Sequence, residues 1–478
     1  MNTNIKDLTD NLIARYENGS LSSRDCSDFL DSVPRFTSKH TTTDTRQFLA
    51  FMGNPDEQMK IIHVAGTNGK GSVCCFLTEI LMSSGYSVGT FVSPHLVDIR
   101  ERFLINDELI EGKDFVESFI YILKKVTEYM DGKWFPTFFE YLFFMAMHYY
   151  SINPVDFLIL ETGLGGRLDA TSTPQNPILC AITEIGLDHM KYLGNTISEI
   201  AGEKAGIIRK GVPVVFIHNR DESADVIRNA AIELGAPFRE IHDKSIRNIM
   251  ISNSDDVHKQ IDFSYYSEYD NYIALRVNSP AVYQTQNASI ACECAFTLRT
   301  LGFHVSDENI RKAVEGAFWE GRMEEIAQDF YVDGAHNADG IEAFLQTAEG
   351  FSCSKKLLLF GVVDDKDYHT MIDDILGSGQ FCEIAVTGLR TGRSVSEEDL
   401  ITAFDDEKKS LEAEDNTNCN ISFYERADEA VNYLLGKRDE IANTQNIRAT
   451  DKPLIFAAGS LYLVGQIKEL MQTAKETR

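Results

Sequence analysis

Positive charge is scarce in this sequence. Lys and Arg together number 45 against 73 Asp and Glu, which gives a formal net charge of −28 at pH 7. Proteins that grip nucleic acid through its phosphates present a basic surface, so this balance argues against that function class. The same charge disfavours adsorption to an anionic membrane. We therefore expect neither nucleic acid nor a membrane as a partner.

Long apolar runs are also missing. The most apolar window, residues 138–150, is interrupted by Glu140 and His148, and it is shorter than the ~20 residues that a membrane-spanning helix needs. We interpret it as a buried helix. The first twenty residues lack the basic patch and the uninterrupted apolar stretch of a signal peptide. These absences together predict a cytoplasmic protein.

Paired cysteine motifs are absent as well. The nine cysteines include no C-x-x-C pair, and neither Cys74-Cys75 nor Cys292-x-Cys294 has His or Cys partners at the spacing of a zinc site. We expect reduced thiols, most of them buried.

What the chain does contain is a repeated pattern of short apolar runs, each followed by a polar turn and a stretch with helical spacing. This pattern predicts parallel strands joined by crossover helices, an α/β fold. Its 478 residues suffice for two or three cores. Two doubly wound sheets in tandem fit better than one sheet of ten strands. The predicted strands are 60–65, 88–92, 156–160, 178–183 and 212–217, then 330–332, 356–360, 383–387, 421–424 and 454–458.

Between the two series, residues 246–277 are polar, aromatic and partly alternating, which predicts a small antiparallel sheet attached to the first domain. A helix is expected at 287–301, with the domain joint near 315–322. We therefore divide the chain into domains 1–318 and 319–478. The highly charged stretch 405–418 is interpreted as a solvated loop or an exposed helix end.

A glycine-rich turn follows the first predicted strand and precedes a helix, in Gly66-Thr67-Asn68-Gly69-Lys70-Gly71-Ser72. Backbone N–H groups of such a turn surround phosphate oxygens, Lys70 would neutralise the β- and γ-phosphates, and Ser72 would reach Mg²⁺. The spacing is unusual, since Val64 stands where the first glycine of the common pattern would be and Gly71 separates Lys70 from Ser72. A turn without a ligand is the alternative, but a lysine, a hydroxyl and both flanking elements favour a nucleotide site.

Further motifs accompany the loop. They are Phe91-Val-Ser-Pro-His-Leu96, Glu161-Thr-Gly-Leu-Gly-Gly-Arg167-Leu-Asp169, Gly186-Leu-Asp188-His189, Glu203-Lys204-Ala-Gly-Ile207, Asn287-Ala288, Trp319-Glu-Gly321-Arg322, Asp333-Gly-Ala-His336-Asn337 and Gly459-Ser460-Leu-Tyr462. In this order, across most of the chain, they resemble the Mur ligase superfamily, which forms amides with ATP. The resemblance is strongest to its folate branch, the folylpolyglutamate synthases, including bacterial forms that also act as dihydrofolate synthases. It implies a P-loop mononucleotide-binding first domain and a Rossmann-like glutamate ligase domain.

The resemblance assigns a Mg²⁺ site to Ser72, Glu161, His189 and Lys204. Taken alone, Glu161 is more simply a salt-bridged acid, His189 a structural histidine and Lys204 an exposed helix lysine. Imidazole is an unusual ligand for Mg²⁺, so His189 rests on the family alone. The family also implies that CO₂ carbamylates Lys204. That reaction requires a neutral amine, so burial must lower the pKa of this lysine.

For the substrates, the resemblance implies three groups of residues. Asn287, Arg322 and Asp333 would bind ATP together with the phosphate loop, where the planar fork of Arg322 suits phosphate oxygens. His336 and Ser460 would face the incoming glutamate, with His336 a candidate proton acceptor; Lys70, Lys204, His336 and Asp333 are the catalytic candidates. The folate end would be formed by Ser93, His95, Phe138, Phe139, Glu140, Arg167 and Asp169.

The implied reaction joins L-glutamate to a folate or to dihydropteroate through an acyl phosphate, with ATP and Mg²⁺, in a monomer. One alternative is another Mur-type ligase, which the 65 residues before Gly66 disfavour because a nucleotide-sugar domain would not fit there. A P-loop switch would leave Asp333-Gly-Ala-His336-Asn337 without a role, and a kinase with the same loop would yield a stable phosphorylated product instead. Tyr283 stands where the family often has His, so the sequence does not define the details of the adenine pocket. It also does not say whether the acceptor is dihydropteroate, a reduced folate or both.

Overall fold

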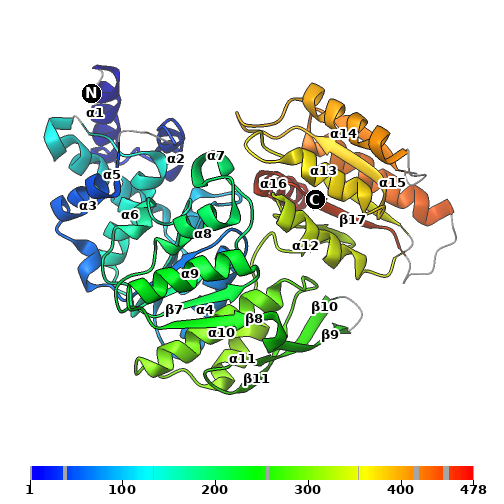
Figure 1. Ribbon diagram of the computed structural model, residues 1–478. Coiled ribbons are helices and arrows are strands. Elements are labelled where there is room, and N and C mark those ends of the chain that lie inside the picture. Colours follow the sequence, from blue (N-terminus) through cyan, green and yellow to red (C-terminus); the bar gives the residue numbers. More distant parts are fainter. Residues whose placement is uncertain are drawn as a thin grey trace.

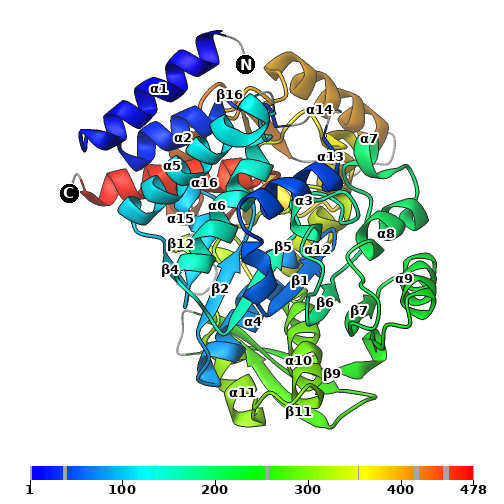
Figure 2. The ribbon, with the colours of Figure 1, turned by 90° about the vertical axis from the view of Figure 1, so that its left-hand side faces the viewer.

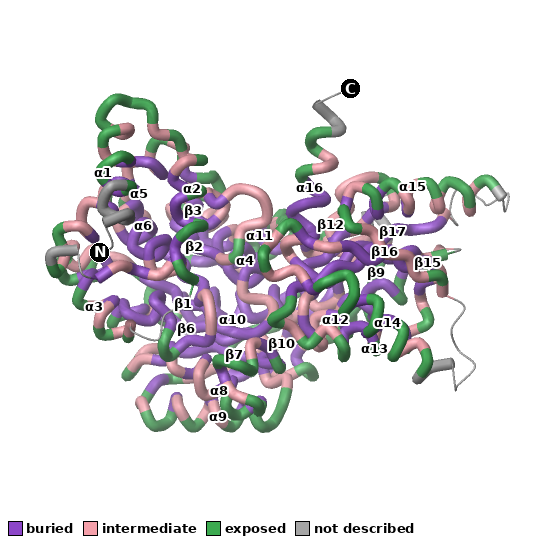
Figure 3. The backbone as a smooth tube through the Cα atoms, turned by 90° about the horizontal axis from the view of Figure 1, so that it is seen from above, coloured by how far each residue is buried: buried purple, intermediate pink, exposed green. Residues whose placement is uncertain are grey.

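Two sheets with helices on both faces form two domains, which lie side by side in Figure 1. The computed structural model describes residues 3–35, 40–132, 134–254, 258–353, 355–412, 419–444 and 452–476. Buried backbone runs through the centre of each domain, and exposed segments surround it (Figure 3). The predicted α/β class with two doubly wound sheets is confirmed.

The first sheet has eight strands in the order β4-β3-β2-β5-β1-β6-β7-β8. Its central strands are parallel and mostly apolar, because helices cover both faces and every side chain of β1 and β5 is buried. The strands are β1 (Ile61–Ala65), β2 (Val88–Phe91), β3 (Phe103–Ile105), β4 (Glu108–Leu109), β5 (Phe157–Glu161), β6 (Leu179–Ile182), β7 (Val214–His218) and β8 (Phe238–His242).

Helices pack on the two faces of this sheet in separate groups. On one face lie α4 (Lys70–Ser83), α10 (Gln284–Thr300) and α11 (Asp307–Gly316). Over half of the other face lie α1 (Thr3–Glu17), α2 (Ser23–Asp31), α3 (Thr42–Phe51), α5 (Gly112–Glu128) and α6 (Phe138–Ile152), gathered at one end of the molecule in Figure 2. The rest of that face carries α7 (Met190–Leu193), α8 (Ile197–Ala205) and α9 (Asp221–Glu233).

The apolar window 138–150 forms the buried helix α6, whose start is fixed by a capping box between Thr137 and Glu140. Among the described residues, every helix falls short of the length and apolarity needed to cross a membrane. All nine cysteines are free, and six of them are buried, as expected. Five short 3₁₀ turns complete this domain: η1 (Pro55–Gln58), η2 (Ile99–Arg102), η3 (Tyr129–Gly132), η4 (Ala170–Ser172) and η5 (Asp243–Ser245).

The antiparallel sheet predicted at 246–277 is present as β9 (Ile246–Ser254), β10 (His258–Tyr266) and β11 (Tyr272–Val277). It packs against α10 through apolar residues of the first domain's core. Sequence reading missed β8, because Phe238-Arg-Glu-Ile-His242 contains three polar residues and no apolar run. An edge strand can afford that composition, since one of its sides faces no further strand.

The second sheet has six strands in the order β12-β13-β17-β14-β15-β16, parallel except for β12. Its strands are β12 (Glu324–Ala327), β13 (Phe330–Val332), β14 (Lys356–Phe360), β15 (Phe381–Thr387), β16 (Asn420–Tyr424) and β17 (Leu454–Ala458). Its helices are α12 (Ala338–Glu349), α13 (Tyr368–Gly377) and α14 (Glu397–Glu412) on one face, and α15 (Ala427–Thr444) and α16 (Leu461–Glu476) on the other.

The connection between the domains runs from the end of α11 at Gly316 to the start of β12 at Glu324. The predicted boundary at 318/319 falls within it, and its exact place stays a prediction. Of the charged stretch 405–418, residues 405–412 form the end of α14, while 413–418 lie outside the described residues.

Candidate active site

A cavity of about 560 Å³ lies where the two domains meet. Its walls come from loops after β1, β5 and β6 of the first sheet and from loops after β13, β14, β15 and β17 of the second. Both sheets thus present their carboxyl ends, the edge at which parallel sheets bind ligands. The predicted site residues among its walls are Thr67, Asn68, Gly69, Lys70, Gly71, Ser72, Ser93, Phe138, Phe139, Glu140, Glu161, Asp169, His189, Lys204, Asn287, Arg322, Asp333, His336 and Ser460.

The phosphate loop is tightly held in the first domain. Thr67 donates its backbone N–H to the Glu184 carbonyl at 2.7 Å, and Lys70 Nζ donates to the carbonyls of Gly66 and Thr67 at 3.1 and 3.2 Å. Gly69 has φ 86° and begins α4; a Cβ there would lie 2.2 Å from Asn287 Oδ1. Only glycine fits this position, so the loop packs directly on Asn287, one of the residues expected to bind ATP.

Glu161 ends β5 inside the cavity and is almost fully buried. One of its carboxylate oxygens accepts the backbone N–H of Ser93 at 2.9 Å. Burial raises the pKa of this carboxyl, against the opposing effect of the nearby Lys70 ammonium. A buried carboxylate in this position favours a cation close by.

Lys204 lies on α8 and is buried at 4% exposure, unlike an ordinary helix lysine. Its Nζ donates to the Gly66 carbonyl at 2.7 Å. Burial lowers the pKa of Lys204 well below its usual value, and the charges of Lys70 and Lys366 lower it further. The amine is therefore neutral more readily than that of a surface lysine.

Three cations in the cavity wall have no carboxylate of their own. Among the described residues, no Asp or Glu oxygen lies within 4.0 Å of the charged nitrogens of Lys70, Arg102 or Arg322. Burial lowers the pKa of the Arg102 guanidinium to about 10. Although the chain carries a net charge of −28, this part of the cavity offers unneutralised positive charge, which suits an anionic ligand.

A second cluster joins the domains around Asp188. Lys366, from the loop after β14, places Nζ 2.6 Å from Asp188 Oδ1 and 3.4 Å from His189 Nε2. His336 Nε2 lies 3.6 Å from Asp188 Oδ2. Burial alone would raise the pKa of the Asp188 carboxyl, but the nearby His336 ring and the Lys366 charge lower it well below its usual value. The same burial and Lys366 lower the pKa of His189 to about 4, so its ring is neutral at pH 7.

Asp333 sits at the end of β13, buried at 3% exposure, and is surrounded by donors. Tyr283 at the start of α10 donates its hydroxyl to Asp333 Oδ2 at 2.5 Å, and the backbone N–H groups of Met323 and Ala335 donate at 3.0 and 2.8 Å. Burial nevertheless raises the pKa of Asp333. The residue that departs from the family pattern, Tyr283, thus ties the first domain to the second.

The end of the cavity assigned to the folate is aromatic and basic. The guanidinium carbons of Arg35 and Arg102 lie 5.0 and 5.5 Å from the Phe138 ring centre. Phe139 packs on Gly163, where a Cβ would lie 2.6 Å from its ring. Glu140 is the partner of Thr137 in the capping box of α6, and its Oε2 lies 3.1 Å from His40 Nδ1.

The other predicted residues have visible structural contacts. Asp169 accepts hydrogen bonds from Leu164 and Thr171, and Ser460 Oγ accepts the backbone N–H of Tyr462. His95 and Arg167 lie outside the cavity wall. His95 accepts Arg102 Nε at 2.9 Å, and Arg167 pairs with Glu203 at 2.6 Å. These contacts explain the positions of the residues, and their roles toward substrates stay predictions.

Sequence reading missed several charged residues of the wall: Arg35, Arg102, Glu184, Asp188, Lys366 and Arg393. Two of them could have been found from the sequence. Asp188 lies in a quoted motif, and Lys366 follows a predicted strand within Asp364-Asp-Lys-Asp367, where a carboxyl-end ligand is expected. Arg35 carried none, because only tertiary packing brings the segment after α2 to Tyr462 of the second domain, at 3.3 Å.

The chain is similar to known proteins over most of its length. The family described as Mur ligase, glutamate ligase domain matches residues 321–441. A Bacillus subtilis dihydrofolate synthase/folylpolyglutamate synthase is 38% identical over 334 residues, covering 68% of this chain and 76% of that protein. A Lacticaseibacillus casei folylpolyglutamate synthase is 31% identical over 356 residues, covering 72% and 81%.

Solved structures agree with these relatives. A Mycobacterium tuberculosis folylpolyglutamate synthase complexed with ADP and AMPPCP superimposes with a TM-score of 0.81 at 23% identity, covering 93% of this chain and 97% of that one. A Thermotoga maritima folylpolyglutamate synthase gives 0.74 at 27% identity, covering 95% and 97%. The first likeness shows the two-domain fold alone.

Proposed function

We propose, because the chain belongs to the family of folylpolyglutamate synthases and dihydrofolate synthases, that it is an ATP-dependent ligase that joins L-glutamate to a folate-type carboxylic acid. The acceptor is a reduced folate, dihydropteroate or both. The ATP phosphates lie on the loop 66–72, and the acceptor lies along the wall that includes Phe138 and Phe139.

The observation that carries this proposal is the set of cavity cations without carboxylate partners. ATP, a folate and glutamate all bring negative charge, and a ligase of this kind must hold these anions close together. Lys70, Arg102 and Arg322 have no Asp or Glu within 4.0 Å among the described residues. Anionic ligands would supply the partners that these cations lack.

The chemical problem is that a carboxylate is a poor acyl donor. ATP solves it by transferring its γ-phosphoryl group to a carboxylate oxygen of the acceptor, with ADP leaving. The glutamate amine then attacks the acyl carbon, the C–O bond to phosphate breaks, and an amide and inorganic phosphate result. Lys70 and Arg322 stabilise charge on the transferred group, because phosphoryl transfer depends on positioning and electrostatics.

The end of β5 offers a place for Mg²⁺. Glu161 is a buried carboxylate there, burial raises its pKa, and Ser72 lines the same cavity. Glu161 and Ser72 would hold the ion. When bound, Mg²⁺ supplies positive charge to the phosphates. His189 fits less well, because its nearest charged neighbours are Asp188, Asp365 and Lys366.

Lys204 has the properties that carbamylation requires. Its amine is buried and its pKa is lowered well below the usual value. A carbamate there would add a carboxylate-like group beside the phosphate loop, since Nζ already contacts the Gly66 carbonyl. We include carbamylation of Lys204 in the proposal on these grounds.

Proton removal from the incoming glutamate amine falls to the cluster at the domain junction. Burial lowers the pKa of His336, so the ring is neutral at pH 7 and can accept a proton. Its Nδ1 faces the Gly334 carbonyl at 2.7 Å, which fixes a proton on Nδ1 and leaves Nε2, near Asp188, as the accepting atom. Ser460 lines the cavity close by in the second domain.

The test follows one oxygen atom. An acceptor labelled with ¹⁸O in its carboxylate is incubated with ATP, Mg²⁺ and L-glutamate, and the released phosphate is examined by mass spectrometry. One labelled oxygen should appear per turnover. Unlabelled phosphate would exclude the acyl phosphate. Separate reactions with dihydropteroate and tetrahydrofolate assign the acceptor, and ATP hydrolysis that needs neither acceptor would support a P-loop switch instead.

A further inference from the structure

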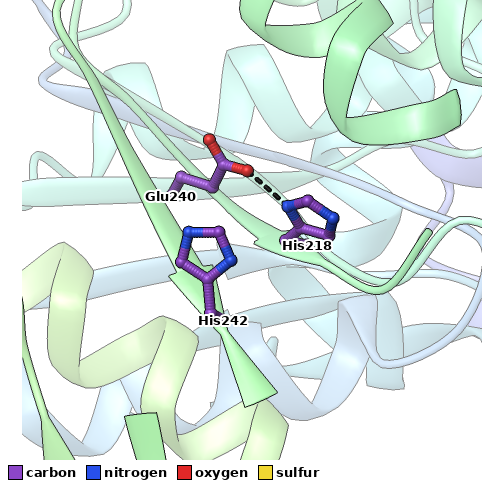
Figure 4. A group of neighbouring side chains, drawn as sticks. All are labelled: His218, Glu240 and His242. Carbon is purple, nitrogen blue, oxygen red and sulfur yellow. Dashed lines mark hydrogen bonds and ion pairs between the residues drawn. The ribbon is translucent and has the colours of Figure 1, made fainter. Parts of the chain in front are cut away.

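A second group of metal-ligating side chains lies outside the cavity wall, at the edge of the first sheet. β7 and β8 are parallel neighbours, and their register places His218 opposite His242. Glu240 lies two residues before His242 and therefore points to the same face of the sheet. Figure 4 shows the two imidazole rings and the carboxylate gathered around one space. Their ligand atoms all lie within 4.8 Å of one another.

The donor set is chemically selective. Two imidazole nitrogens and a carboxylate oxygen suit borderline cations such as Zn²⁺, Co²⁺ or Ni²⁺, whereas Mg²⁺ prefers oxygen alone. Asp221 on α9 holds the other nitrogen of the same ring, because its Oδ1 lies 2.8 Å from His218 Nε2. That contact orients the imidazole and leaves Nδ1 to the metal.

The geometry already approximates a coordination sphere. His218 Nδ1 and Glu240 Oε1 are 2.6 Å apart, and two ligand bonds of about 2.0 to 2.2 Å to a tetrahedral ion would require them to separate by about 0.8 Å. The two imidazole ring centres are 4.9 Å apart. Among the described residues, no group makes a hydrogen bond to the ring of His242, so one imidazole is uncommitted.

The surrounding charges leave room for a divalent cation. Arg228 binds Glu240 through Nε and Nη2 at 3.0 and 2.7 Å and also pairs with Asp225. With neutral imidazoles, the three carboxylates of Glu240, Asp221 and Asp225 exceed the single charge of Arg228 by two. The cation would take the place of the proton that His218 now shares with Glu240, and the Arg228 hydrogen bonds could remain.

We propose that His218, Glu240 and His242 form a binding site for a borderline divalent cation such as Zn²⁺, with water as the remaining ligand and Asp221 holding the His218 ring in place. The site is separate from the proposed Mg²⁺ site, because none of its residues lines the cavity. It would join the ends of β7 and β8 to the first turn of α9.

Equilibrium dialysis of Zn²⁺ against the metal-free full chain, with Mg²⁺ in excess, tests this proposal. The wild-type chain should bind one Zn²⁺ that His242→Ala binds at least about tenfold more weakly. His369→Ala, which removes an exposed histidine of α13, is the matched control and should bind like the wild type. Equal Zn²⁺ binding by wild type and His242→Ala would overturn the proposal, because any bound ion would then lie elsewhere, for example beside His189.

A spectroscopic measurement tests the proposal even if His242→Ala fails to fold. X-ray absorption of the Zn²⁺-loaded wild type should show two imidazole ligands together with oxygen, and the milder His242→Gln should show one. A ligand set without histidine would overturn the proposal. Ligase activity should stay unchanged in His242→Gln, which distinguishes failure of this site from failure of the proposed function.

Discussion

The carboxyl ends of the first sheet carry two kinds of electrostatic environment. At β1 and β5, in the centre, ionisable groups are buried without counter-ions of their own: Lys204 donates to a carbonyl and Glu161 accepts from a backbone N–H. At β7 and β8, on the edge, His218 lies between two carboxylates and Glu240 is held by Arg228. The centre therefore needs ligands as partners for its ionisable groups, whereas His218 and Glu240 at the edge already have partners among neighbouring side chains.

Removing a cation from the centre should cost far more activity than removing one from the edge. Lys70→Met deletes a charge that we place on the transferring phosphoryl group, so kcat should fall by about 1000-fold, near the upper range for losing one transition-state contact. Arg228→Met is the matched control, because its charge is bound by Glu240 and Asp225. Steady-state ADP release measures both, and similar losses in the two variants would refute the distinction.

Lys204 gives a second test of the difference between the centre and the edge of the sheet. Lys204→Met should lower kcat by about 100-fold if the residue contributes a carbamate next to the phosphates. Carbon-13 NMR after incubation with ¹³CO₂ should show a carbamate signal in the wild type and none in Lys204→Met. Lys468 is the control lysine, since it pairs with Glu320 and Glu324. Wild-type chain without a carbamate signal would remove this part of the mechanism.

Sequence alone predicted the central strands of the sheets better than the edge of the first sheet. In the second sheet, β14 and β17 were located to the residue, because buried parallel strands are mostly apolar runs. β8 was missed because the charged residues Arg239 and Glu240 find their partners only through tertiary packing, in Glu293 and Arg228. Likewise, motifs indicated Asp333 and His336, but no pattern could show that Arg35 reaches the second domain.

Tyr283 tests whether a contact between the domains positions the nucleotide. Tyr283→Phe removes the 2.5 Å hydrogen bond to buried Asp333, and loss of a hydrogen bond to a charged group costs roughly 1.5 kcal/mol. We expect KM for ATP to rise about tenfold, with a smaller change in kcat.

Tyr265→Phe provides the comparison for this variant. It removes an equivalent 2.6 Å hydrogen bond to buried Glu293 outside the cavity. It should lower the melting temperature and leave KM for ATP unchanged. If both variants changed KM alike, the Tyr283 effect would reflect stability and not positioning.

Two histidines of this sheet should respond to pH in opposite directions. Burial lowers the pKa of His63 in β1 from 6.5 to about 3, so below pH 6.5 the unfolded chain takes up a proton that the folded chain does not. The free energy of unfolding should then fall by about 1 kcal/mol between pH 7.5 and pH 5.5 through this residue. His63→Asn can keep a hydrogen bond to Thr171 and should remove that part of the loss in urea titrations.

At the edge, hydrogen bonds from His218 to Glu240 and Asp221 raise its pKa, although burial alone would lower it. Its stabilising contribution is therefore complete below pH 6.5 and disappears as pH rises through the pKa of the folded state. In metal-free buffer with a chelator, His218→Asn should lose stability relative to wild type at pH 5.5 and little at pH 9. The change in stability should be smaller than that caused by His63, because solvent screens the partly exposed His218 ring. A loss of equal size at both pH values would show that the charge of His218 contributes nothing, and that edge and centre differ in burial alone.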